Sequence, residues 1–324
     1  MTASQIRSLL INLLRVGVSG ALLAWVLSQT GLDRLGLALR GADLRPYAGA
    51  LLIGLAGIGV RAWRWKVLLD AVGARLPFGR LVYLYFVGTF FNAFLPTGFG
   101  GDMVRVLEIG AGASSAQAAG TTVVERLTGF IVLFALALAA LPFSQGLLPP
   151  ALNGLVALGG AGVLLGSLLL FEGRWLRRLT AGLGRWRLTR AFALEGTGWL
   201  AQTYAVITAA GRAALARALA IALLFNGIMV AAGVLIAAAL HIPASAPVLL
   251  VFITVATVTL LLPISISGLG VREGVYVALF AQIGVGDAPA VAFSLAYYSM
   301  DLAAGLAGGL LYLLNGLRRL RGRG

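Results

Sequence analysis

The chain has 324 residues, of which 60% are hydrophobic and only 11% are charged, and its mean hydropathy is +0.96. Soluble globular proteins carry about 25% charged residues, so this composition excludes a soluble enzyme, a disordered chain and a small secreted scaffold. No stretch is polar enough to form a soluble domain. We therefore expect an all-α polytopic membrane protein, with a single integral membrane domain over residues 1–324.

The net charge is +14, and Lys66 is the only lysine, so the basic residues are almost all arginine. They stand at the edges of apolar runs, where arginine reports membrane topology and contact with anionic headgroups rather than nucleic acid. The chain has no cysteine and a single histidine, His241, so we expect no metal site and no cofactor. The expected partners are membrane lipids, either an anionic phospholipid or a lipid-linked substrate, and a homo-oligomer is left open.

Six apolar runs follow one another along the chain, at 9–27, 47–69, 118–141, 151–171, 219–240 and 288–314. Each holds enough residues to cross a hydrocarbon core of about 30 Å at about 1.5 Å per residue. No small-residue cleavage site follows the first run, so it is predicted to be a retained span rather than a signal peptide.

Two further apolar segments, 81–95 and 248–262, each stop at a proline inside a glycine-rich break. The breaks contain Pro96, Gly98, Gly100 and Gly101 in the first case and Pro263, Gly268 and Gly270 in the second. Proline and clustered glycine end a helix, and broken backbone at membrane depth is tolerated only where protein or a watery cavity satisfies it.

The arginine distribution predicts the topology. If both termini are cytoplasmic, nineteen of the 25 basic residues fall on the cytoplasmic side. The positive-inside rule therefore favours this orientation. The chain then has a first half (1–172), a basic amphipathic connector lying on the inner leaflet (173–217) and a second half (218–316). This assignment leaves about six full spans and two re-entrant helical hairpins in an inverted repeat, in a bacterial cytoplasmic (inner) membrane. Eight ordinary spans are the alternative.

Charged residues cluster directly after the two breaks. Each helix that restarts there presents unpaired N–H groups and partial positive charge, which suit an anion such as phosphate. Asp102 and Arg105 are three residues apart and share a helix face, whereas the adjacent side chains of Arg272 and Glu273 are expected to diverge. The alternative is that proline and glycine only permit tight packing.

Three more ionisable residues, Glu125, Arg126 and Asp301, lie inside apolar runs. A charge at mid-membrane costs at least about 2.5–3.5 kcal/mol, so such residues usually face a cavity or a partner. The alternative is structural ion pairing of Asp102 or Glu125 with Arg105 or Arg126. Asp301 has no local partner and is the better functional candidate, while helix–helix hydrogen bonds are expected from Tyr297 and Asn226.

A compact basic and aromatic cluster, containing Arg61, Arg64 and Trp65, ends the second apolar run. It is either an interfacial anchor or a contact for lipid headgroups at the cytoplasmic mouth of a lipid path.

Four ordered motifs now resemble one known family. They are RAWRWKVLL (61–69), FFNAFLPTGFGGDMVR (90–105), which includes Asn92, VERLTG (124–129) and LPISISGLGVREG (262–274). Together they resemble the membrane domain of the lysylphosphatidylglycerol synthase/flippase family, and the resemblance covers nearly the whole chain. It implies movement of aminoacylated or other phospholipids between leaflets. The sequence ends at Gly324 without the soluble aminoacyltransferase domain of the full-length synthases, so only the flippase-like activity is implied.

The leading hypothesis is therefore a lipid flippase or translocase with a central cavity and no catalytic residues. Arginines and hairpin N–H groups would hold the phosphate, and carboxylates would hold a cationic headgroup or a coupling proton. The alternatives are a membrane enzyme for glycosyl or phosphoryl transfer on a lipid-linked substrate and a proton-coupled small-solute transporter. The enzyme would be expected to carry an Asp-x-Asp metal pair or a nucleotide-binding loop, and the sequence has neither.

Overall fold

A computed structural model describes residues 17, 19–94, 100–110, 112–144, 149–172, 199–260 and 268–321. These residues form helices and turns and no strand. A helical segment at 19–30 comes first. The labelled helices are α2 (Leu32–Arg40), α3 (Leu44–Ala71), α4 (Phe78–Phe94), α5 (Gly100–Leu107), α6 (Ser115–Ala140), the 3₁₀ helix η1 (Leu141–Ser144), α7 (Pro150–Glu172), α9 (Trp199–Ala239), α10 (Ala246–Thr259), α11 (Val271–Ala281) and α12 (Asp287–Arg321). The expectation of an all-α protein is confirmed for the described residues.

Four of these helices are long and apolar enough to cross a membrane: Leu44–Ala71, Ser115–Phe143, Thr203–Ala239 and Asp287–Gly316. Three of them contain a predicted span, and Thr203–Ala239 covers all but the last residue of the span at 219–240. Two shorter apolar stretches, Asn153–Leu168 and Ala246–Thr259, lie in α7 and α10. Residues 9–16 and 18 of the predicted first span lie outside the described residues. The protein is membrane-embedded, and the predicted six spans and inverted repeat remain predictions.

Polar residues define where the long helices begin. Asp43 caps α3 by accepting a hydrogen bond from the Arg45 backbone N–H at 2.9 Å. Ser114 and Gln117 cap α6 reciprocally, each side chain bonding the other's backbone N–H at 3.1 and 2.9 Å. Such caps satisfy N–H groups that have no partner within the first helical turn.

The two segments predicted to be broken form helix–break–helix units, α4/α5 and α10/α11, whose partner helices pack together. The intervening residues 95–99 and 261–267 lie outside the described residues. Each unit also packs against a helix of the other predicted half, since α4 contacts α12 and α10 contacts α6. Gly305 and Gly308 let α12 approach the backbone of α4, where a Cβ would meet Phe90 and Phe86 respectively. The two halves are therefore joined reciprocally.

The end of the predicted connector differs from expectation. Residues 199–217 belong to α9, which continues without interruption to Ala239 except for a kink at Gly211 (φ 71°). Val206, Ile207 and Leu215 are buried against Leu68 of α3 and Val124 of α6. The described end of the connector thus packs one face against the protein, while its other face, which carries Arg212 and Arg217, is exposed. Residues 173–198 lie outside the described residues.

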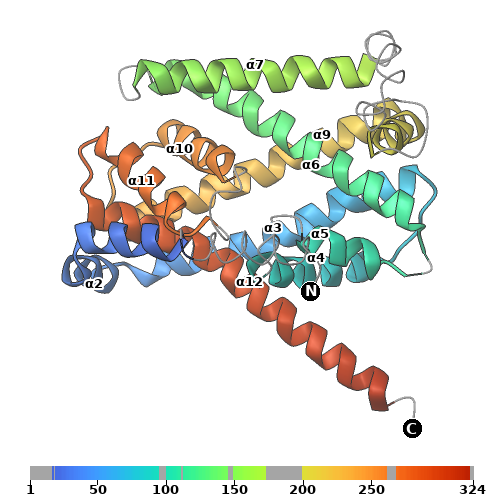
Figure 1. Ribbon diagram of the computed structural model, residues 1–324, viewed down its shortest axis with the longest axis horizontal. Helices are drawn as coiled ribbons and strands as arrows, with labels where there is room; N and C mark the ends of the chain where they lie inside the picture. Colours follow the sequence, from blue (N-terminus) through green and yellow to red (C-terminus); the bar gives the residue numbers. More distant parts are fainter. Residues whose placement is uncertain are drawn as a thin grey trace, which may run out of the picture.

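The long helices cross one another near the middle of the molecule. Figure 1 shows α6 and α9 crossing there, with α7 along one edge and the C-terminal part of α12 extending beyond the other helices. Helices α3 and α9 pack along each other extensively. The site described next lies where α3, α6, α9, α10 and α12 meet.

Candidate functional site

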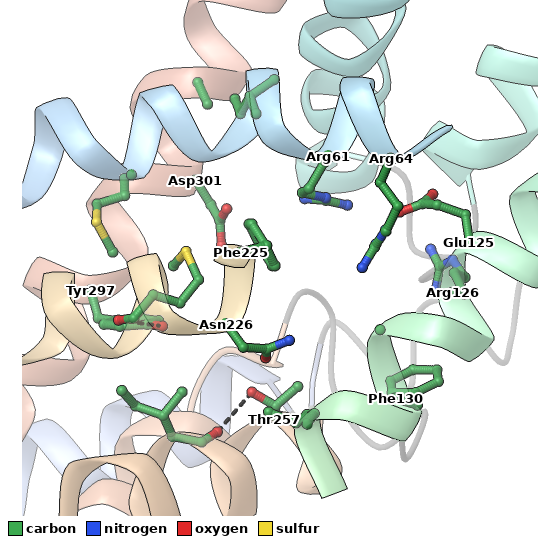
Figure 2. A pocket seen from close by; sticks show the side chains of 18 residues that line it. Arg61, Arg64, Glu125, Arg126, Phe130, Phe225, Asn226, Thr257, Tyr297 and Asp301 are labelled. Carbon is green, nitrogen blue, oxygen red and sulfur yellow. Dashed lines mark hydrogen bonds and ion pairs between the residues drawn. The ribbon is translucent and has the colours of Figure 1, made fainter. Parts of the chain in front are cut away.

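A cavity of about 310 Å³ lies between helices of both predicted halves. Its charged and polar lining, labelled in Figure 2, comprises Arg61 and Arg64 from α3, Glu125 and Arg126 from α6, Asn226 from α9, Thr257 from α10, and Tyr297 and Asp301 from α12. Five predicted site residues are therefore brought together, although they come from three separate helices. A central site between two halves is the arrangement typical of transporters.

A network of five charged side chains lies at and beside this cavity. Arg64 and Arg105 both pair with Glu125, Arg105 at 3.4 Å. Arg105 also pairs with Asp102 at 2.7 Å, and Asp102 pairs in turn with Arg126. The predicted shared face of Asp102 and Arg105 is confirmed. So is the alternative of structural ion pairing, because the paired groups hold α3, α5 and α6 together.

Arg64 has the most unsatisfied atoms of this network, in which Arg105 Nη1 and Asp102 Oδ2 also lack a hydrogen-bond partner among the described residues. Arg64 is buried (4% exposed), and its Nη2 bonds to Glu125. Its Nε and Nη1 atoms find no hydrogen-bond partner among the described residues. Figure 2 shows this guanidinium pointing from α3 into the enclosed space. A buried donor without an acceptor costs about 1–3 kcal/mol, and more when it is charged, so these atoms favour an anionic ligand.

Gly129 of α6 makes room for this arginine. A Cβ built on Gly129 would lie 3.2 Å from Nη1 and 3.5 Å from Nη2 of Arg64. Any side chain here would therefore crowd the guanidinium. The glycine ends the VERLTG motif, and its position in the sequence does not reveal this contact.

Arg105 is held by aromatic rings on its other side. Its guanidinium carbon lies 4.1 Å from the centroid of the Tyr85 ring and 4.8 Å from that of Trp65. Trp65 is fully buried and donates through Nε1 to Thr121 Oγ1 at 3.0 Å. The burial of Arg64 and Trp65 argues against the interfacial-anchor alternative for these two residues, because an anchor needs contact with the membrane surface. Arg61 lies over Tyr85 and Phe225, at 5.2 and 5.6 Å.

The opposite side of the cavity carries Asp301. Figure 2 shows it on the side away from Glu125 and Arg126, next to Phe225. Among the described residues it makes no hydrogen bond or ion pair, and its side chain is exposed to the cavity. Asp301 lies about 21 Å along α12 from Asp287. Tyr297 bonds the Met229 carbonyl of α9 at 3.5 Å, as expected, whereas the Asn226 amide bonds its own helix at Ala222.

The charges after the second break form a separate group that does not line the cavity. Arg272 pairs with Glu273 at 2.8 Å, and Ser294 donates to the same carboxylate at 3.1 Å. Arg272 also lies 4.0 Å from the centroid of the Tyr298 ring. The expectation that the side chains of Arg272 and Glu273 diverge is wrong. The reason is that Glu273 turns back toward the start of α11, where its Oε2 accepts from the Gly270 N–H at 2.7 Å.

After each break, a backbone N–H group at the start of the next helix already donates to a side chain of the protein itself. Asn92 accepts from the Gly101 N–H at 2.7 Å, as Glu273 does from Gly270. Gly101 packs directly against the backbone of Gly88. Gly270 has φ 80°, and a Cβ on it would lie 2.5–2.9 Å from Leu22 and Leu23. These glycines serve close packing here, which agrees with the alternative interpretation of the breaks.

The remaining predicted site residues divide into two groups. Gly100 is buried at the start of α5, and Gly268 stands just before α11 with φ 75°. Pro96, Gly98 and Pro263 lie outside the described residues. Tyr85, Phe225 and Thr257 were not predicted to lie at the site. An aromatic or hydroxyl residue in an apolar helix gives no signal of its own.

Four arginines and three carboxylates thus lie at or beside the cavity: Arg61, Arg64, Arg105 and Arg126 against Asp102, Glu125 and Asp301. Among the described residues, no three His, Asp or Glu side chains gather as possible metal ligands. The site can bind an anion at its arginine-rich side and a cation or proton at Asp301.

A family model described as the lysylphosphatidylglycerol synthase TM region matches residues 12–309. The chain belongs to this family. A search of curated proteins finds no match. The part matched to the lysylphosphatidylglycerol synthase TM region includes every residue that lines the central cavity. The protein is accordingly a membrane protein related to lipid modification or translocation.

Proposed function

We propose that this protein is a lipid translocase that moves a phospholipid or lipid-linked headgroup between leaflets through the central cavity. The observation that carries the proposal is the buried Arg64 guanidinium, which faces the cavity with Nε and Nη1 unsatisfied. Because both atoms are buried, a phosphodiester oxygen would accept from them after the side chains that cover them shift. One charge-assisted hydrogen bond of this kind contributes about 1.5–3 kcal/mol.

The network behind Arg64 keeps it in place for this role. Glu125 holds one nitrogen of Arg64 and is itself shared with Arg105. A guanidinium that is already oriented loses less conformational freedom when it binds a phosphate. The ligand thus completes a partly filled set of hydrogen bonds and does not have to break the Arg64–Glu125 pair.

The side of the cavity with Asp301 would hold a cationic part of the headgroup or a coupling proton. Asp301 is exposed to the cavity and makes no ion pair among the described residues. The two sides together suit a headgroup with a phosphate at one end and a positive group at the other.

We further propose that α4/α5 and α10/α11 are re-entrant hairpins of an inverted repeat, with both termini on the cytoplasmic side of a bacterial inner membrane. Their reciprocal packing, α4 on α12 and α10 on α6, supports this topology. The chain has no cysteine, so single cysteines can map it. Ala93→Cys should react with an impermeant thiol reagent from the cytoplasmic side and Leu269→Cys from the outside. Labelling from the reverse sides would contradict the proposal.

The function is tested in proteoliposomes that contain fluorescent phosphatidylglycerol, by adding a membrane-impermeant reductant and following the loss of the inner-leaflet fluorescence that remains after the outer leaflet is bleached. Arg64→Gln should lower the translocation rate at least about tenfold, which is the effect of losing about 1.4 kcal/mol. The matched control is Arg75→Gln, because Arg75 is exposed and outside the cavity. Equal rates for the two variants would reject the proposal.

The unpaired Asp301 also favours a second candidate, a proton-coupled small-solute transporter using the same cavity. In that case an imposed pH gradient would drive uptake of a soluble zwitterion into vesicles, and the rate of lipid exchange between leaflets would equal that of protein-free vesicles.

A further inference from the structure

An apolar groove of about 610 Å³ runs along the outside of the protein between α5 and α6. Met103, Val106 and Leu107 line it from α5, and Ala119, Val123 and Leu127 line it from α6. The α6 positions are four residues apart, and Val106 and Leu107 lie three and four residues after Met103, so each set lies on one side of its helix. From Ala119 to Phe130 the groove follows α6 for about 16 Å.

The groove is open to the surroundings of the protein along most of this length. Met103 and Leu107 are 62% and 77% exposed, although they are large and apolar. Asp102 and Arg126 line the part nearest the central cavity, here called the charged end, although their charged atoms add almost no polar surface to the groove. The groove itself therefore suits a hydrocarbon chain, and a charged group attached to that chain would lie outside it.

The charged end of the groove adjoins the central cavity. Arg126 and Phe130 line both the groove and the cavity. Arg126 pairs with Asp102, which belongs to the same charge network as Arg64. A single molecule could therefore have its phosphate at Arg64 and its chain between α5 and α6.

We propose that the groove between α5 and α6 is the site for a hydrocarbon chain of the same lipid whose phosphate lies at Arg64. This proposal rests on the proposed function and deepens it. The lipid enters sideways between the two helices and need not pass the headgroup and the chain through one opening. Arg126, at the junction, lies where the headgroup meets the chain.

The competing occupant is ordinary surrounding lipid, which would cover the groove without being recognised. Surrounding lipid has no reason to prefer this groove over another exposed apolar face. The α7 helix provides such a face, because Leu158 and Leu165 are 77% and 61% exposed. A recognised lipid should label the groove more than α7, and this labelling should depend on Arg64. Surrounding lipid should label both faces alike, whatever residue stands at position 64.

The first arm of the test uses the wild-type protein in phosphatidylcholine nanodiscs that contain phosphatidylglycerol with a diazirine near the end of one acyl chain. After illumination, mass spectrometry should find the label on α5 and on the 119–127 part of α6. Excess unlabelled phosphatidylglycerol should reduce this labelling, and Arg64→Gln should reduce it about tenfold. Equal labelling of α7, or labelling of the groove that is unchanged in Arg64→Gln, would overturn the proposal.

The second arm fills the groove. Val123→Trp should slow translocation of the long-chain lipid about tenfold, while binding of water-soluble glycerophosphoglycerol to the cavity stays within about twofold. Leu158→Trp, an equally bulky change on α7, should alter neither. Full translocation by Val123→Trp would overturn the proposal. The proposed function fails separately if the wild-type protein shows Arg64-dependent labelling of the groove but no translocation, since the lipid site then exists without transport.

Discussion

Arg64 donates to Glu125 through Nη2 alone, and its Nε and Nη1 atoms have no acceptor among the described residues. A charge pair that served packing alone would be expected to use more of the guanidinium, because each unmet buried donor lowers stability. The proposed phosphate site rests on these two unsatisfied atoms of Arg64.

Replacing Arg64 by lysine separates charge from geometry. Lysine can keep the pair with Glu125 but lacks the planar fork that would also reach a phosphate. We expect Arg64→Lys to change the melting temperature little and to lower phosphatidylglycerol translocation about tenfold, with Arg64→Gln lower still. The measurements are thermal unfolding in detergent and the proteoliposome rate. A wild-type rate in Arg64→Lys would show that charge alone suffices.

Gly129 offers a test that leaves every charge in place. Because a Cβ at this position would lie 3.2 Å from Arg64 Nη1, Gly129→Ala should displace the guanidinium and weaken glycerophosphoglycerol binding by about three- to tenfold, or about 0.7–1.4 kcal/mol. The control is Gly162→Ala in α7, where a Cβ would meet nothing within 4 Å. If both alanine variants bind equally well, the position of Arg64 is not what Gly129 protects.

How far the sequence predicts this site depends on the residue. The two breaks and the pairing of Asp102 with Arg105 follow from proline, glycine and helical spacing, which act locally. The position of Arg64 at the cavity cannot be predicted in this way, because its neighbours Trp63 and Trp65 make the segment resemble an interfacial anchor. Only the packing of α3 against α6 and α9 turns this arginine into the cavity.

At the second break, the motif is clear in the sequence but the contacts of its charged residues are not. Its Gly-x-Gly and charges match those of the first, and yet Arg272 and Glu273 are satisfied by one another, by Ser294 and by Gly270. Ser294 lies 21 residues beyond Glu273 in the chain, so sequence spacing could not reveal the contact. Similar motifs in the two halves therefore belong to a charge network that reaches the cavity in one half and to a separate internal pair in the other.

Asp102 and Arg126 should behave as a coupled pair at the junction of cavity and groove. They form an ion pair, and both line the groove. In a double-mutant cycle with Asp102→Asn and Arg126→Gln, we expect the effects on translocation to be non-additive by about 0.5–3 kcal/mol. The lipid rate of the two single variants and the double variant provides the measurement. Strict additivity would mean that the two side chains act independently.

Glu273 is expected to act on stability rather than on transport. Glu273→Gln leaves the buried Arg272 without its charge partner and weakens the cap on Gly270, which should cost about 3 kcal/mol. The melting temperature should fall clearly, while glycerophosphoglycerol binding by the folded protein is retained. A loss of binding at unchanged stability would instead assign this pair to the ligand site.

Asp301 should give the reverse outcome in the same two measurements. It has no hydrogen bond or ion pair among the described residues, so Asp301→Asn removes no stabilising contact. An ionised carboxylate in the middle of a span costs at least about 2.5–3.5 kcal/mol, so the melting temperature should stay the same or rise. Translocation should nevertheless fall about tenfold, because the variant can neither carry a proton nor attract a cationic headgroup. If the asparagine variant unfolds as early as Glu273→Gln, Asp301 is structural, and the cavity has one functional side instead of two.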